Sequence, residues 1–223
     1  MDRFSARRNN YMQPITAAHF DVYRFCEAGK PESYVPSVVP LIYETASDYF
    51  NLLFGSREEG LEQLTHWSKR PSSEYSILRA TGLMQGEDCL GIVIGLGGKD
   101  RNDCHKADIL ALLKSGAFRM QSLSCGGFEA LRDPLPRVPA DVYYIRAISV
   151  ASKWRGHGLG KQLMQIAIEQ GRLGRYKSFR VDVRADNKSA WRLYETLGFV
   201  PIAQASNPIT ASAMVALQYK DAE

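Results

Sequence analysis

Glycines alternate with other residues along 155–160, between an apolar run, Tyr143–Val150, and a segment with helical spacing of apolar residues. A strand that turns through glycines into a helix exposes backbone N–H groups at the positive end of the helix dipole. Such a loop suits phosphate, because glycine permits positive φ and lets the backbone approach an anion closely. We therefore predict a phosphate-binding loop made of Arg155, Gly156, His157, Gly158, Leu159, Gly160 and Lys161.

Spacing excludes two common phosphate-binding motifs in this loop. A P-loop requires Gly, four residues and then Gly-Lys-Ser/Thr. Here Gln162 follows Gly160-Lys161, and Arg155 stands where the first glycine belongs. A dinucleotide fingerprint requires Gly-x-Gly-x-x-Gly, but the third glycine position after Gly156 is occupied by Lys161.

The loop fits a third pattern, Arg-x-x-Gly-x-Gly, through Arg155, Gly158 and Gly160. This pattern resembles the pyrophosphate-binding signature of the GNAT superfamily of N-acetyltransferases, which use acetyl-CoA. A second run, Asn187–Phe199, is similar to that family's segment Asn-x-x-Ala-x-x-Leu-Tyr-x-x-x-Gly-Phe at every specified position. An alternating strand over 177–184 separates the two motifs. The resemblance covers about residues 143–202, which we take as the cofactor-binding core.

The composition fits one globular domain of ordinary kind. The chain has 223 residues, of which 45% are hydrophobic and 23% charged. A formal charge of +4 suits a polyanionic ligand such as CoA, but it is too small to indicate nucleic acid. No stretch approaches the ~18 apolar residues of a membrane span. The four cysteines lack paired spacing, so we expect reduced thiols in a cytoplasmic protein.

We expect residues 1–14 to form a flexible lead-in and residues 15–223 to form a single N-acetyltransferase domain. The order of elements predicts an α/β fold with a mixed, mostly antiparallel central sheet flanked by helices, and the resemblance implies the same architecture. A helical insertion over about 99–140 departs from the family, whose corresponding strands are joined by a short hairpin. The other expected elements are a strand near 18–26, one helix from Pro36 to Gly55, a helix capped by Ser56 with Glu59, strands Glu74–Ala80 and Cys89–Gly95 joined by Gly82–Asp88, and a final strand Ser212–Tyr219.

The resemblance also implies roles for residues outside the loop. Ile148 and Val150 are expected to contact the pantetheine arm through their backbone, with the N–H of Val150 as the oxyanion donor. Tyr194 is expected to protonate the departing thiolate, since a phenol is protonated at neutral pH. A core tyrosine is the structural alternative. Asn187 fits a helix cap, a cofactor contact or both, and Arg155 and Lys161 could equally be solvated basic residues.

The sequence assigns no general base. The strand before the loop carries Arg146 and no carboxylate, while Asp182 alternates away from the apolar face of the next strand. Glu44 is a weak candidate. Cys104-His105 could suggest a thiol–imidazole pair or metal ligands, but we expect a polar loop there, and neighbouring residues on a loop seldom face one site. We therefore expect no metal site.

The leading hypothesis is acetyl transfer from acetyl-CoA to the primary amine of a small molecule or a peptide. The alternative is a regulatory or structural module that binds CoA without turnover. Neither reading involves nucleic acid or a membrane. Dimers are common in such families, so a homodimer is among the expected assemblies.

Overall fold

The structure, a computed structural model, describes residues 20–115, 134–206 and 212–221. The expected lead-in over 1–14 and part of the expected insertion lie outside them. The described strands form a seven-stranded sheet with the order β1-β2-β3-β4-β5-β7-β6. These strands are β1 (Asp21–Arg24), β2 (Ala80–Gln85), β3 (Asp88–Gly97), β4 (Val142–Val150), β5 (Ser178–Arg184), β6 (Val200–Ala205) and β7 (Met214–Lys220).

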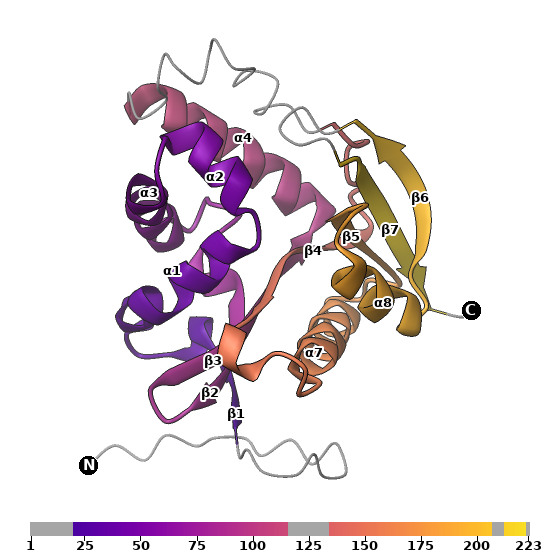
Figure 1. Cartoon of the computed structure of the whole chain (residues 1–223), viewed down its shortest axis with the longest axis horizontal. Helices are drawn as coiled ribbons and strands as arrows, with labels where there is room; N and C mark the ends of the chain where they lie inside the picture. The colour runs from indigo at the N-terminus through magenta and orange to yellow at the C-terminus, as the bar shows by residue number, and fades with distance from the viewer. Residues whose placement is uncertain (1–19, 116–133, 207–211, 222–223) are drawn as a thin grey trace.

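The sheet is mixed and mostly antiparallel, as expected, because β4 and β5 form its one parallel pair within the described residues. The α-helices α1 to α4 lie to one side of the central strands and α7 and α8 to the other (Figure 1). Their bounds are α1 (Val35–Glu44), α2 (Ser47–Phe54), α3 (Arg57–Lys69), α4 (Gly98–Ser115), α7 (Leu159–Leu173) and α8 (Lys188–Thr196). Short 3-10 turns are η1 (Phe25–Glu27), η2 (Pro31–Tyr34), η3 (Ile77–Arg79) and η4 (Ser152–Trp154).

The core has a layer on each face of the sheet. On one face, Phe50 of α2 packs in a cluster with Ile92 of β3 and Ala147 of β4. On the other, the buried stripe of α7 packs against β4 and β5. Gly171 makes this contact close, since a Cβ there would lie 2.5 Å from the ring of Phe179. The apolar face of α7 thus fixes the start of that helix beside the end of β4.

The expected single helix from Pro36 to Gly55 is wrong, because α1 ends at Glu44 and α2 begins at Ser47. Pro40 lies inside α1 and removes one helical donor. The hydroxyl of Thr45 bonds the carbonyl of Ile42 at 2.6 Å, and Ala46 leaves the helical region with φ −154° and ψ 49°. The break matters because it places the α1–α2 turn beside the site described below.

The expected strand Glu74–Ala80 and the expected connection Gly82–Asp88 are also wrong, since β2 begins at Ala80 and runs to Gln85. Hydroxyl groups hold the preceding segment in turns: Ser73 Oγ accepts from Tyr75 N at 3.1 Å. Gly86, with φ +61°, makes the tight turn from β2 into β3. The predicted cap of α3 is confirmed, because Ser56 Oγ accepts from Glu59 N at 3.2 Å.

The first described part of the insertion is the helix α4, which replaces the polar loop expected around Cys104, and residues 134–140 at its other end are not helical. This helix packs against β3 and β4. None of the described helices combines the length and the apolarity needed to cross a bilayer.

Candidate active site

Strands β4 and β5 separate along their length. They pair through Val142–Ile145 and Ser178–Val181, and within the described residues the second half of β4 has no paired strand on that side. The N–H of Ala151 donates to the carbonyl of Leu90 on the β3 side at 2.9 Å. By alternation, the N–H groups of Val150 and Ile148 point to the opposite, open edge. Both N–H groups are therefore oriented to donate hydrogen bonds to a ligand at this edge, which is where the sequence predicted backbone donors.

A β-bulge at Arg146 produces this arrangement. Ile145 pairs with Gly95 and Ala147 pairs with Ile94, which leaves Arg146 as the extra residue of β4. A bulge shifts the side-chain alternation by one position. As a result Arg146 lies on the face covered by α2 and α4, whereas Ile148 and Val150 pack with the α7 core.

The glycine loop has the conformation that its sequence predicted. Gly156 and Gly158 have φ of 82° and 77°, and α7 begins immediately after Gly158. The carbonyl of Gly158 accepts from Lys161 N at 3.0 Å. The N–H groups of Leu159 and Gly160, in the first turn, have no partner within the helix. They provide donors for an anion at the positive end of the helix dipole.

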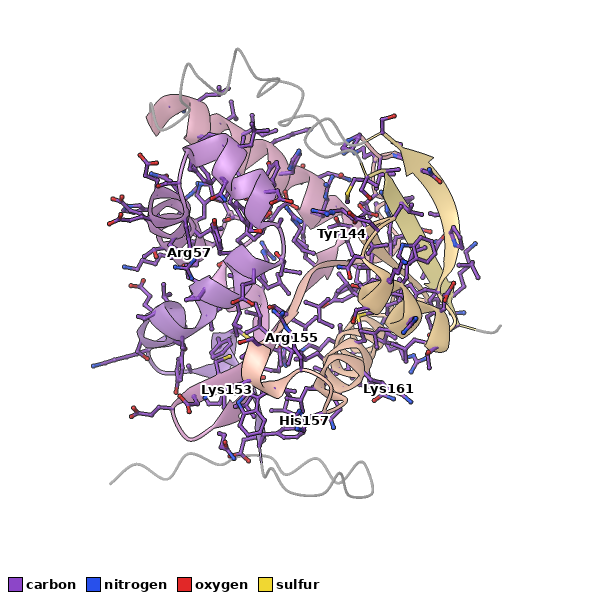
Figure 2. All side chains as sticks on the ribbon, in the orientation of Figure 1. Arg57, Tyr144, Lys153, Arg155, His157 and Lys161 are labelled. Carbon is purple, nitrogen blue, oxygen red and sulfur yellow. The ribbon has the colours of Figure 1, made fainter. Side chains whose placement is uncertain are left out.

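A cavity of about 950 Å³ extends from this loop into the opening between β4 and β5. Its volume is at the upper end of the range for ligand sites, which suits a long ligand such as CoA together with an acceptor. Every residue that the sequence proposed for the site lines this cavity, except His157. The loop's Arg155 lies near the centre of the view and His157 near its lower edge (Figure 2). His157 Nδ1 instead lies 3.0 Å from the carbonyl oxygen of Arg155.

Arg155 is more than a solvated cation. Its Nε donates to the carbonyl of Val150 at 3.0 Å, and its Nη2 lies 2.7 Å from Glu44 Oε2. Arg155 therefore ties the loop to the end of β4 and to the end of α1. Lys161, in contrast, is exposed at the cavity rim.

Tyr194 lines the cavity from α8 and is 3% exposed. Burial, and secondarily the charge of Asp182, raises its pKa, so the phenol is protonated throughout the neutral range. Its ring packs against Phe199 with centroids 6.0 Å apart. Asn187 caps α8, since its Oδ1 accepts from Ala190 N at 3.1 Å, and it also lines the cavity. The capping role is thus confirmed, while a ligand role stays a prediction.

The other end of the cavity holds a buried ionic cluster that the sequence did not reveal. Glu74 is 1% exposed, and three cationic or protonatable side chains contact its carboxylate. His105 Nδ1 lies 2.7 Å from its Oε1, and the Nε atoms of Arg146 and Arg101 lie 3.0 and 3.5 Å from its Oε2. Burial alone would raise the pKa of Glu74, but Arg146, His105 and Arg101 together lower it, so the carboxylate is charged. The spacing of Arg101 and His105, four apart on a helix, was the one available signal.

The guanidinium of Arg146 also lies over the ring of Tyr75, 4.5 Å from the centroid, and donates to the Tyr75 hydroxyl. Arg146, His105 and Arg101 all line the main cavity. The cluster therefore forms a rigid polar wall rather than a solvated patch.

Asp182 alternates away from the apolar face of β5, as expected, and this turns it into the cavity. Arg180 holds it with two bonds, Nε to Oδ1 at 2.7 Å and Nη2 to Oδ2 at 3.1 Å. The hydroxyl of Tyr144, which Figure 2 places between α4 and the β5 side of the molecule, donates to Oδ2 at 3.1 Å. Asp182 is therefore a paired carboxylate with both oxygens occupied.

Cys104 and His105 face different surroundings, as the sequence analysis expected of neighbours. The thiol of Cys104 is buried and accepts from Arg79 Nη2 at 3.3 Å, whereas His105 contacts Glu74. Within the described residues, no group of three His, Cys, Asp or Glu side chains is placed to hold a metal ion.

Asp108 is a buried carboxyl beside the cluster. Its Oδ2 accepts from Ser73 Oγ at 3.0 Å and from Glu74 N at 2.9 Å. Burial raises its pKa from 3.8 to about 6, although these bonds and Arg70 act in the opposite direction. Its folded-state pKa is above its unfolded value, so its stabilising effect is complete below pH 3.8 and is lost as the pH rises through about 6.

We therefore expect Asp108→Asn to become more stable relative to the wild type as the pH rises. The difference in unfolding free energy between the two proteins should shift toward the variant by up to roughly 3 kcal/mol between about pH 4 and about pH 7. Urea unfolding at a series of pH values measures it. Asp103→Asn, at an exposed position of the same helix, is the control. An equal difference at all pH values would contradict the expectation.

Comparison with known proteins agrees with this geometry. A relative in Saccharomyces cerevisiae, N-alpha-acetyltransferase 30, is 35% identical over 57 residues, which span 26% of this chain and 32% of that protein. A crystal structure described as an acetyltransferase superposes with a TM-score of 0.63 at 18% identity, covering 85% of this chain and 95% of the other. A chain from the NatC complex bound to Gag peptide and CoA superposes with a TM-score of 0.57 at 14% identity, covering 92% and 100%.

These two structures share the fold of this chain. The family model of the acetyltransferase (GNAT) family matches residues 41–199, which include β4, the glycine loop, β5 and α8. The match covers more than half of the sequence. The chain therefore belongs to the GNAT acetyltransferase family.

Proposed function

We propose that this protein transfers the acetyl group of acetyl-CoA to a primary amine. The observation that carries the proposal is one cavity lined by the glycine-rich start of α7, the open edge of β4 and a protonated tyrosine. Acetyl-CoA supplies the activated thioester when bound. The protein's own residues supply the binding, the orientation and the proton.

The residues fit CoA by their chemistry. The first N–H groups of α7 and the exposed Lys161 would bind the diphosphate. The open edge of β4, at Ile148 and Val150, would hold the amide groups of the pantetheine arm by strand-like hydrogen bonds. Both sets of donors line one continuous cavity.

Catalysis would depend on two groups in that cavity. A backbone N–H of Val150 or Ile148 would stabilise the negative charge that develops on the thioester oxygen, a role worth about 10²–10³ in rate. Tyr194 would give its phenolic proton to the departing sulfur. Because burial raises its pKa, Tyr194 keeps that proton until the sulfur becomes basic.

We infer that the acceptor amine is the N-terminus of a peptide. The support is the similarity to a yeast N-alpha-acetyltransferase and the fold shared with a NatC chain whose structure contains a peptide. An α-amine, with a pKa of about 8, is partly neutral at physiological pH and ready to attack. Small-molecule amines are the alternative acceptors. A cytoplasmic location is part of the proposal, since the three cysteines in the described residues are free thiols.

The test is thiol release from acetyl-CoA with a panel of peptides that differ in their first two residues, alongside small primary amines. Turnover on peptides with a free N-terminus, and its loss when that amine is blocked, would support the proposal. Saturable CoA binding with no thiol release on any amine would favour the alternative, a CoA-binding module without turnover.

A further inference from the structure

His105 lies between a buried carboxylate and the cavity. Its side chain is 22% exposed and that of Glu74 is 2% exposed, so the imidazole is the solvent-facing member of the pair. Nδ1 is 2.7 Å from Glu74 Oε1. A carboxylate only accepts, so Nδ1 carries a proton, and in the neutral imidazole Nε2 then has the lone pair. This is the tautomer that a general base requires.

Two further cationic side chains contact the carboxylate of Glu74, which accepts from His105. Arg146 and Arg101 approach the other carboxylate oxygen at 3.0 and 3.5 Å, so the charge of Glu74 is compensated. The titratable and charged groups that line the two cavities adjoining His105 are Glu44, Asp48, Tyr49, Glu74, Tyr75, Arg101, Asp108, Tyr144, Arg146, Arg155, Lys161, Asp182, Arg184, Asp186 and Tyr194.

The other carboxylates that line the main cavity are less suited to accept a proton. Asp182 has both oxygens bonded by Arg180, and Tyr144 adds a third bond. Glu44 is paired with Arg155, and Asp48 with Arg184. Asp186 is bonded by Arg184 as well, and this lowers its pKa.

We propose that His105 is the general base of acetyl transfer and that Glu74 is its positioning residue; this rests on the function proposed above. His105 Nε2 takes a proton from the amine nitrogen as that nitrogen forms its bond to the acetyl carbon. The carbon–sulfur bond breaks, its electron pair stays on sulfur, and Tyr194 gives its proton to that sulfur. One proton leaves the amine and one reaches the thiol, and transfer from imidazolium to phenolate restores both residues.

The proposal is tested with His105→Gln and a matched control, His66→Gln, whose side chain is exposed on α3 away from the cavity. Two peptides serve as probes, one with a free N-terminus and one with a blocked N-terminus and a lysine. We expect His105→Gln to lower kcat by about 100-fold or more at pH 7 while CoA affinity stays unchanged. We also expect its pH–rate profile to lose the rise that belongs to the imidazole and to keep the rise that belongs to the amine. The control should match the wild type.

An NMR measurement of the imidazole nitrogens in the free protein gives a readout that needs no turnover. We expect Nδ1 to carry the proton at neutral pH, and we expect Glu74→Gln to weaken this preference for Nδ1. A proton on Nε2 with Nδ1 unprotonated would overturn the proposal, as would a His105→Gln variant with the kcat or the pH profile of the wild type. A wild-type protein that binds CoA and acetylates neither probe would contradict acetyl transfer to peptides, and His105 would lose its role with it.

Discussion

Replacing Gly158 by glutamate is expected to weaken CoA binding by at least about 100-fold. Gly158 has φ 77°, and a side chain there costs about 1 kcal/mol of backbone strain. A carboxylate at the start of α7 also opposes the diphosphate and competes for its N–H donors. One lost charge-assisted hydrogen bond is worth about 1.5–3 kcal/mol, and about 2.8 kcal/mol corresponds to 100-fold.

Gly86 provides the matched control for this substitution. It also has positive φ, +61°, but it lies in the β2–β3 turn and does not line the cavity. Gly86→Glu should therefore carry a similar conformational cost and bind CoA as the wild type does. Isothermal calorimetry measures the two affinities and thermal melting the two stabilities. If Gly158→Glu retained wild-type affinity for CoA, the diphosphate would not bind at this loop.

The conformation of the glycine loop could be predicted because its residues act locally. Positive φ at Gly156 and Gly158 is a property of glycine itself, and the cap on α8 follows from the type of Asn187. These features depend on neighbours in sequence. The fold class could be predicted for the same reason, because the apolar residues recur with a period of 3.6 along α7 and a period of 2 along β5.

The end of the cavity that holds the ionic cluster of Glu74 could not be predicted because it depends on contacts between distant segments. Glu74 precedes η3, His105 lies on α4 and Arg146 on β4, and no local pattern brings them together. The turn at Ser73–Ser76 depends on side-chain hydroxyls, which competed successfully with the strand propensity of that segment. The bulge at Arg146 is also set by pairing with β3. Both features lie at the cluster end of the cavity.

The two ends of the cavity differ in whether their polar groups are paired within the protein. The loop end presents backbone N–H groups and the exposed Lys161, which attract a polyanion. The cluster end pairs each charge internally, and a charge without its partner there would be costly. Binding energy is thus available at the loop end, while the proposed general base lies at the cluster end.

Tyr194→Phe is expected to lower kcat by about 10²–10⁴ while leaving CoA affinity nearly unchanged. The phenol lines the cavity, and burial keeps it protonated at neutral pH. Phenylalanine preserves the packing against Phe199 and removes only the proton donor. The matched control is Tyr143→Phe. Tyr143 is also buried, at 8% exposure, and burial raises its pKa to about 12, but it does not line the cavity.

The pair of variants separates the two roles open to Tyr194. A general acid predicts a large loss of kcat for Tyr194→Phe and almost none for Tyr143→Phe, measured as initial rates of thiol release from acetyl-CoA. A core tyrosine predicts that both variants alter the melting temperature and leave kcat in place. Raising the pH should not rescue Tyr194→Phe, because the missing group is an acid and the sulfur still departs without a proton. Wild-type kcat in Tyr194→Phe would show that this tyrosine only packs, and the thiolate would then take its proton from water.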